Sequence, residues 1–166
     1  MSAKTGIVAR HEKVAFMQVS GTSGTYTRMK KFQSFSTSKN AKEFTRSYVD
    51  EAFEESDVLG YSPSISYSFD QHIGNAVHDD IVKITDGELI GEDAVRSIIV
   101  VDMTQDGSAS GAKKAKERKF AIIPDTEGDG TDSYTYSGTM KCKSISVEGE
   151  AVSTDDWETC TFTASK

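Results

Sequence analysis

A strict alternation of apolar and hydroxyl side chains, SISYSF at positions 64–69, constrains the fold of this chain most strongly. In an extended chain, Ile65, Tyr67 and Phe69 lie on one face and the three serines lie on the other. Pro63 comes directly before this run, where a missing N–H group is tolerated. The pattern therefore predicts a strand over Ser62–Asp70 in a sheet that has one buried and one polar face.

A long polar excursion, Ser38–Gly60, precedes this strand. Connections of roughly 20 residues inside a compact domain are usually functional or disordered. Disordered segments are poor in aromatic residues, whereas this one contains Phe44, Tyr48 and Phe53. Its charges are also segregated, with basic residues first and acidic residues from Asp50 onward. We therefore expect a long functional loop between two early strands.

The remaining pattern indicates further strands and turns. Lys13–Val19 and Thr25–Thr37 are predicted strands, and the Gly/Ser turn between them favours a hairpin. The later predicted strands are Ala94–Met103, Phe120–Ile123 (ended by Pro124), Ser133–Val147 and Trp157–Thr163. Within Ser133–Val147 the apolar residues change from even to odd positions, which predicts a bulge near Lys143 or Ser144.

One segment, Ile73–Ile84, has helical rather than strand periodicity. Asn75 can cap its N-terminus and Asp86-Gly87 can end it. The run Ile98–Val101 predicts a strand that is buried on both faces. The expected fold is a single, mainly β domain over residues 1–166: an antiparallel sandwich or partly open barrel with one flanking helix. Residues 1–9 are expected to form a flexible N-terminal arm.

Composition excludes several classes of protein. The net charge of −7 argues against binding nucleic acid through the overall field. No apolar run approaches the ~20 residues of a membrane helix, and the N-terminus lacks the apolar core of a signal peptide. We therefore expect folding in a cytosol, no membrane partner, and reduced thiols at Cys142 and Cys160.

The search for catalytic motifs finds no nucleophile elbow and no phosphate-binding glycine loop. His72 and His78 are six residues apart, a spacing that places them on different sides of a helix. The acidic turn Asp125–Asp132 imitates the start of a calcium loop, but Tyr136 stands where the closing glutamate is needed. We expect no enzyme activity, cofactor or metal site, and ion binding at this turn is left open.

Blocks of charge alternate along the chain. Arg28–Arg46 and Lys113–Lys119 are basic, whereas Asp50–Asp57, Asp125–Asp132 and Glu148–Glu158 are acidic. Such runs are usually solvated surface. A sharper hypothesis is that opposite charges lie at opposite ends of the subunit, so that copies associate head to tail into rings or filaments.

Four stretches carry a resemblance to a known family: residues 34–71, 74–84, 116–144 and 153–162. They resemble the major tail tube protein of long-tailed, non-contractile bacteriophages of Gram-positive hosts. The likeness spans roughly Gly6–Phe162, and it consists of whole segments rather than a catalytic signature.

The resemblance implies a structural virion protein, made in the host cytoplasm, that forms homo-hexameric rings. These rings stack into a tail tube that guides the tape-measure protein and passes DNA during ejection without binding it specifically. One sheet would contribute to an inner barrel around an acidic lumen. The loop 38–60 would reach the next ring through these candidate residues: Lys39, Lys42, Arg46, Tyr48, Asp50, Glu51, Phe53, Glu54, Glu55 and Asp57.

Two alternatives stay open from the sequence. One is the tube of a contractile tail or of a tail-like particle, including a secretion apparatus. The other is a carbohydrate-binding β-sandwich that uses Tyr134, Tyr136 and Trp157 as a stacking platform, although alternating strands favour packing these aromatic residues in the core.

Overall fold

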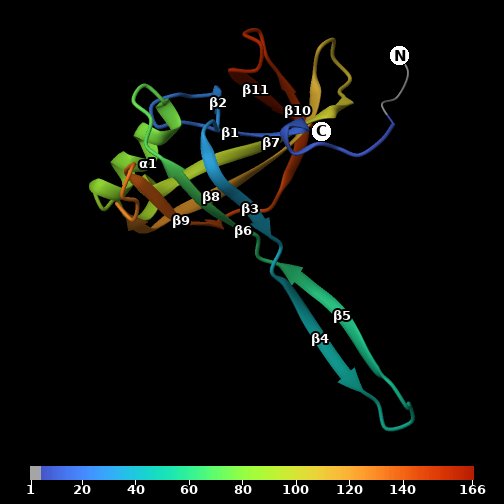
Figure 1. Ribbon diagram of the computed structural model, residues 1–166. Helices are drawn as coiled ribbons and strands as arrows, with labels where there is room; N and C mark the ends of the chain where they lie inside the picture. Colours follow the sequence, from blue (N-terminus) through green and yellow to red (C-terminus); the bar gives the residue numbers. More distant parts are fainter. Residues whose placement is uncertain (1–4) are drawn as a thin grey trace.

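Six antiparallel strands close into a barrel in the computed structural model, which describes residues 5–166 (Figure 1). The barrel order is β10-β11-β2-β1-β7-β8, and pairing of β10 with β8 closes it. The strands are β1 (Lys13–Met17), β2 (Tyr26–Arg28), β7 (Val95–Asp106), β8 (Lys113–Glu127), β10 (Val147–Val152) and β11 (Thr159–Ala164). The prediction of a mainly β sandwich or barrel is thus confirmed. Residues 1–4 of the predicted flexible arm lie outside the described residues.

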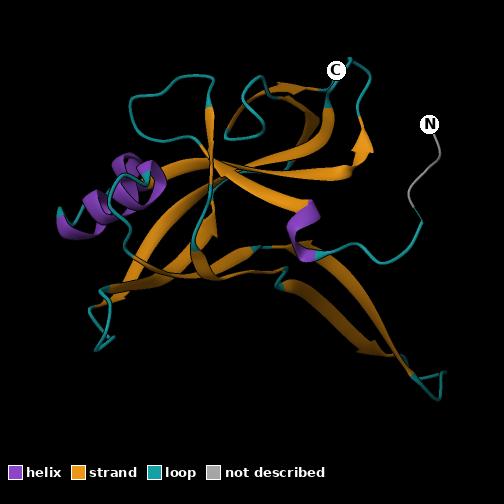
Figure 2. Cartoon of the chain, turned by 45° about the horizontal axis from the view of Figure 1, so that its top comes forward, coloured by secondary structure: helices purple, strands orange, loops and turns teal. Residues whose placement is uncertain are grey.

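The sheet continues beyond the barrel through β8. The C-terminal half of this long strand pairs with β9 (Thr135–Cys142), followed in order by β6 (Ser64–Asp70) and β3 (Phe32–Ser38). Strands β4 (Ala41–Ser47) and β5 (Glu54–Tyr61) form a separate two-stranded sheet. Figure 2 shows the longest helix at one side of the body and the β4–β5 pair extending away from the body.

The flanking helix α1 spans Ala76–Asp86. As predicted, the Asn75 side chain caps it, accepting hydrogen bonds from the backbone N–H groups of Val77 (3.1 Å) and His78 (3.2 Å), and Gly87 ends it. The predicted start at Ile73 is wrong, because Asn75 has an extended backbone and Ile73 lies fully exposed ahead of the cap. Two short 3-10 helices, η1 (Arg10–Glu12) and η2 (Gly91–Ala94), precede β1 and β7.

Two hydrophobic clusters stabilise the body. One lies between α1 and the extended sheet and includes Phe69, Ile81 and Met140. The other fills the barrel and includes Phe16, Ile99 and Ala151. The run at 98–101 serves both clusters, because Ile98 belongs to the first and Ile99 and Val101 belong to the second. Burial on both faces is therefore confirmed, except that Val100 is 39 % exposed.

Three strand boundaries differ from the prediction. The strand expected over Thr25–Thr37 breaks between β2 and β3, at a corner where Lys31 has φ 59°. Pro124 lies inside β8 rather than at its end, where the register with β9 shifts. The change of parity after Cys142 is not a bulge, because the chain leaves β9 and starts β10, which pairs with β11 and β8.

Candidate functional site

The segment predicted as a long loop is a β-hairpin that projects from the body (Figure 1). Strands β4 and β5 pair antiparallel, with Ala41 opposite Tyr61 and Ser47 opposite Glu54. The loop prediction was wrong because charged residues were interpreted as loop residues. Here they are interspersed with Phe44, Val58 and other residues that favour strands.

All ten predicted contact residues lie in this hairpin and are exposed. Lys39 precedes β4, which carries Lys42 and Arg46. The connection between the strands carries the next four: Tyr48, Asp50, Glu51 and Phe53. Strand β5 carries the last three: Glu54, Glu55 and Asp57. The structure thus brings all ten residues together on one arm.

The hairpin also exposes apolar side chains that the sequence prediction had not included. Val49 is fully exposed, and Val58, Leu59 and Tyr61 are each more than half exposed. The hairpin contributes no residue to either hydrophobic cluster. A two-stranded hairpin is at best marginally stable alone in water. Large exposed apolar side chains on such an arm are typical of a surface that another molecule covers.

One pair of opposite charges lies across the two strands of the hairpin. Arg46 is opposite Glu55 in the register, and the Arg46 guanidinium lies 5.1 Å from the centre of the Phe44 ring. The connection at the tip remains acidic, through Asp50 and Glu51. The hypothesis of charged patches at opposite ends of the subunit stays a prediction.

The extended sheet has a hydroxyl-rich face opposite its core face. The register places Ser34, Ser68, Ser137 and Thr126 in one row across β3, β6, β9 and β8. The next row begins with Ser36, Ser66 and Thr139, and a third begins with Ser38 and Ser64. Residues in register share a face. The alternation at 64–69 thus belongs to a broad hydroxyl surface, on which Lys141 is the charged member of the third row.

Both outer strands of this extended sheet have an edge without a partner strand among the described residues. Beyond Ala121, β8 pairs with β9 but no longer with β7, so 122–127 leaves one edge open. On the far side, β3 pairs with β6 alone. One backbone group of the β3 edge is occupied, since Arg10 donates a 3.0 Å hydrogen bond to the carbonyl of Phe35. Open edges of this kind are sites for pairing with another chain.

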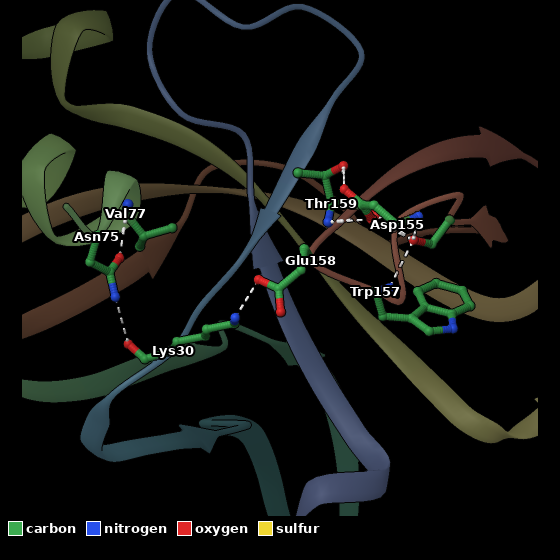
Figure 3. A network of polar contacts seen from close by, with 8 residues as sticks. Lys30, Asn75, Val77, Asp155, Trp157, Glu158 and Thr159 are labelled. Atoms are coloured by element: carbon green, nitrogen blue, oxygen red, sulfur yellow. Dashed lines mark hydrogen bonds and ion pairs between the residues drawn. The ribbon is translucent and has the colours of Figure 1, made fainter.

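A polar network fixes the corner between β2 and β3 (Figure 3). The backbone carbonyl of Lys30 accepts a hydrogen bond from the Asn75 side chain (3.2 Å) and is hydrogen-bonded to Nε2 of His78 (2.9 Å). The ammonium group of Lys30 forms an ion pair with Glu158 in the β10–β11 connection. Asp155 and Thr159 are hydrogen-bonded within the same connection. Helix, corner and barrel are therefore tied together at one point.

Burial lowers the pKa of His78 below its ordinary value of 6.5, and the nearby His72 lowers it further, whereas the Lys30 carbonyl and Asp79 raise it. As the pH falls, the His78 imidazole is therefore protonated at a higher pH in the unfolded chain than in the folded chain. We expect the free energy of unfolding to fall as the pH drops below 6.5, by at most about 1.4 kcal/mol per pH unit. Urea unfolding at pH 7.5 and 5.5 should show this loss in the wild type and in His11→Gln. An equal loss of unfolding free energy in His78→Gln would contradict the assignment of this pH dependence to His78.

No arrangement for catalysis emerges from residues 5–166. They contain no group of three or more His, Cys, Asp or Glu residues that could hold a metal ion. His72 and His78 do lie together, with ring centres 5.6 Å apart, because His72 precedes the helix and its N–H donates to Nδ1 of His78. Cys142 and Cys160 are free thiols, and burial raises the pKa of Cys160 to about 12.

Within the described part of the chain, no helix is both long and apolar enough to cross a membrane.

The aromatic residues considered for a carbohydrate platform do not form one. Tyr136 is buried in the cluster beneath α1, while Trp157 packs in the barrel cluster with its ring 6.2 Å from Phe16. Tyr134 is half exposed beside Tyr136. Stacking on a sugar needs aromatic faces that are exposed together, so this arrangement disfavours such a site.

Comparisons with known proteins support the fold. No family model matches the sequence, and no curated protein matches it. Among solved structures, the chain is similar to one chain of the anti-feeding prophage (AFP) baseplate, determined by cryo-EM and six-fold symmetrised. The TM-score is 0.51 at 4 % identity, over 87 % of this chain and 97 % of that chain. At this identity the likeness concerns the fold alone.

Proposed function

We propose that this protein is a structural, non-enzymatic subunit of a phage tail or tail-like particle, and more narrowly a tail tube subunit. The observation that carries the proposal is the β4–β5 hairpin, which packs against neither core cluster yet exposes large apolar side chains such as Val49 and Phe53. Its stability and its solubility both call for a covering partner. The segment resemblance to tail tube proteins and the fold shared with the AFP baseplate chain favour a second copy.

The open edges of the extended sheet support lateral association into a ring. The four strands β8, β9, β6 and β3 are antiparallel neighbours, so β8 and β3 run in opposite directions. Rotation about a ring axis preserves the direction of each strand. The β3 edge of one copy can therefore pair antiparallel with residues 122–127 of the next copy. We propose homo-hexameric rings in which these sheets join into one inner barrel.

In such a ring, the hydroxyl-rich face would line the lumen, because α1 covers the opposite face. The lining would then be rich in hydroxyl groups such as those of Ser66 and Thr139 rather than strongly acidic. Serine and threonine hydroxyls carry no fixed charge, so they make few of the counterion-releasing phosphate contacts that hold DNA binders in place. This surface would let the tape-measure protein and the genome pass without specific binding.

Stacking of rings is assigned to the hairpin, whose ten predicted contact residues would reach the neighbouring ring. Its exposed apolar residues would be covered there, and its charges would select the register more than they add affinity. A tube of a contractile tail or tail-like particle would use the same surfaces, and the AFP baseplate likeness is compatible with it.

The test is negative-stain electron microscopy of the concentrated full chain, with light scattering after size exclusion. We expect six-fold rings or hollow tubes. A protein that remains monomeric at high concentration, also after addition of preformed tail tips from the same particle, would overturn the assembly proposal.

A further inference from the structure

A basic corner lies where β2 turns into β3. Arg28 and Lys31 are both solvent-accessible, and neither forms an ion pair within the described chain. Lys31 is held at φ 59°, a conformation that costs free energy in a residue other than glycine. The Lys30 network described above fixes this corner. The two cations are thus presented on a rigid support, and the carboxylate that shares their hollow, Glu158, forms its ion pair with Lys30.

A groove runs from this corner between β1 and β3. One part of it, about 430 Å³, is lined by five basic residues and no acidic one: Arg10, His11, Lys13, Arg28 and Lys31. Lys13 is partly neutralised by Asp102 at 3.8 Å. The adjoining part, about 480 Å³, has apolar walls that include Val8, Phe35 and Val100. The groove therefore combines a positive end with an apolar end, alongside the open edge of β3.

The complementary feature is the acidic end of β8 and the turn that follows. The four carboxylates of Asp125, Glu127, Asp129 and Asp132 are exposed, and none forms an ion pair within residues 5–166. Ile123, in the same open edge, is 45 % exposed. This segment thus offers an apolar side chain followed by negative charge.

The register places the two features at the same end of the extended sheet. Glu127 is opposite Tyr136, Tyr136 is opposite Phe69, and Phe69 is opposite Phe32, the residue after Lys31. The acidic turn and the basic corner therefore lie on opposite edges of the sheet at one level. Within one subunit they are kept apart by β9 and β6. Between two copies joined edge to edge, they meet.

We infer that the groove between β1 and β3 is the receptor for the 122–132 segment of a second copy, with Arg28 and Lys31 facing that copy's acidic turn. This rests on the proposed function, because it names the contact that closes the proposed ring. The pairing of charges would fix the register of the edge strands and exclude a reversed neighbour. It also gives a role to the exposed acidic turn.

A charge-swap experiment tests the inference on the full chain. The variant Arg28→Glu/Lys31→Glu makes the corner acidic, and Glu127→Lys/Asp129→Lys makes the turn basic. Each variant alone should need a roughly tenfold higher concentration for half-assembly, because like charges then face each other at every contact. An equimolar mixture should assemble like the wild type, since alternating copies satisfy every contact in an even-numbered ring. Light scattering and microscopy give the readout.

The control Lys83→Glu/Lys119→Glu makes the same change in net charge as the corner variant, at two exposed sites that do not line the groove, and should assemble normally. If the wild type assembles but both variants assemble equally well, the inference fails while the proposed function stands. If the corner variant is rescued by Asp50→Lys/Glu51→Lys instead, the hairpin tip is the ligand and the inference is overturned. If the wild type does not assemble at all, the proposed function fails first.

Discussion

Removal of the β4–β5 hairpin is expected to abolish stacking into tubes while leaving a folded subunit. Residues 41–61 can be replaced by two glycines, because the chain ends already meet, with the Ser62 N–H donating to the Lys39 carbonyl at 3.3 Å. The hairpin supplies nothing to either core cluster, so the free energy of unfolding should change by no more than about 0.5 kcal/mol. Thermal melts and electron microscopy measure the two effects separately.

A second variant separates the hairpin's surface from its mere presence. Val49→Ser/Phe53→Ser keeps the backbone and removes two apolar side chains from the connection, which should weaken stacking by about tenfold or more. Thr45→Ser/Ser56→Thr, which exchanges hydroxyl residues paired at 3.1 Å, is the matched control. Normal tubes from the deletion variant would refute the stacking role, whereas rings without tubes would assign lateral contact and stacking to different surfaces.

The sequence predicted the structure correctly where interactions between neighbouring residues determine it. The alternation at 64–69 predicted a strand with one buried and one hydroxyl face, and the register confirms both. The Asn75 cap and the Gly87 stop were also correct, because capping depends on neighbouring residues only. The resemblance gave only 38–60 as a candidate for assembly, and the structure places that segment on an exposed arm.

The errors have a common physical origin in long-range pairing. A polar run was interpreted as a loop at 38–60, since an exposed hairpin has no buried face to produce a clear alternation. The parity change after Cys142 was assigned to a bulge, since the sequence does not show that β10 pairs with β8 and β11. The basic corner was noted only as part of a charge run. Its importance depends on the open edges of the sheet, which arise from strand order and not from local composition.

Asp80 is the clearest residue whose role was missed, and its removal should cause the largest loss of stability. In the sequence it lies within the predicted helix 73–84, with nothing to mark it as buried. In the structure it is buried, and its carboxylate accepts hydrogen bonds from Arg96 at 2.6 and 3.1 Å. This pair joins α1 to the start of β7. A buried ion pair contributes modestly in itself, but loss of one partner leaves an uncompensated buried charge.

Asp80→Ala is therefore expected to lower the free energy of unfolding by about 3–5 kcal/mol, which corresponds to a fall in Tm of roughly 10 °C for a domain of this size. The double variant Asp80→Ala/Arg96→Met should regain most of that loss, because a long apolar side chain replaces the unpaired guanidinium. Urea unfolding of the wild type, Asp80→Ala, Arg96→Met and the double variant gives the coupling between the two residues. If Asp80→Ala and the double variant are equally destabilised, the loss comes from packing around α1 and not from an unpaired charge.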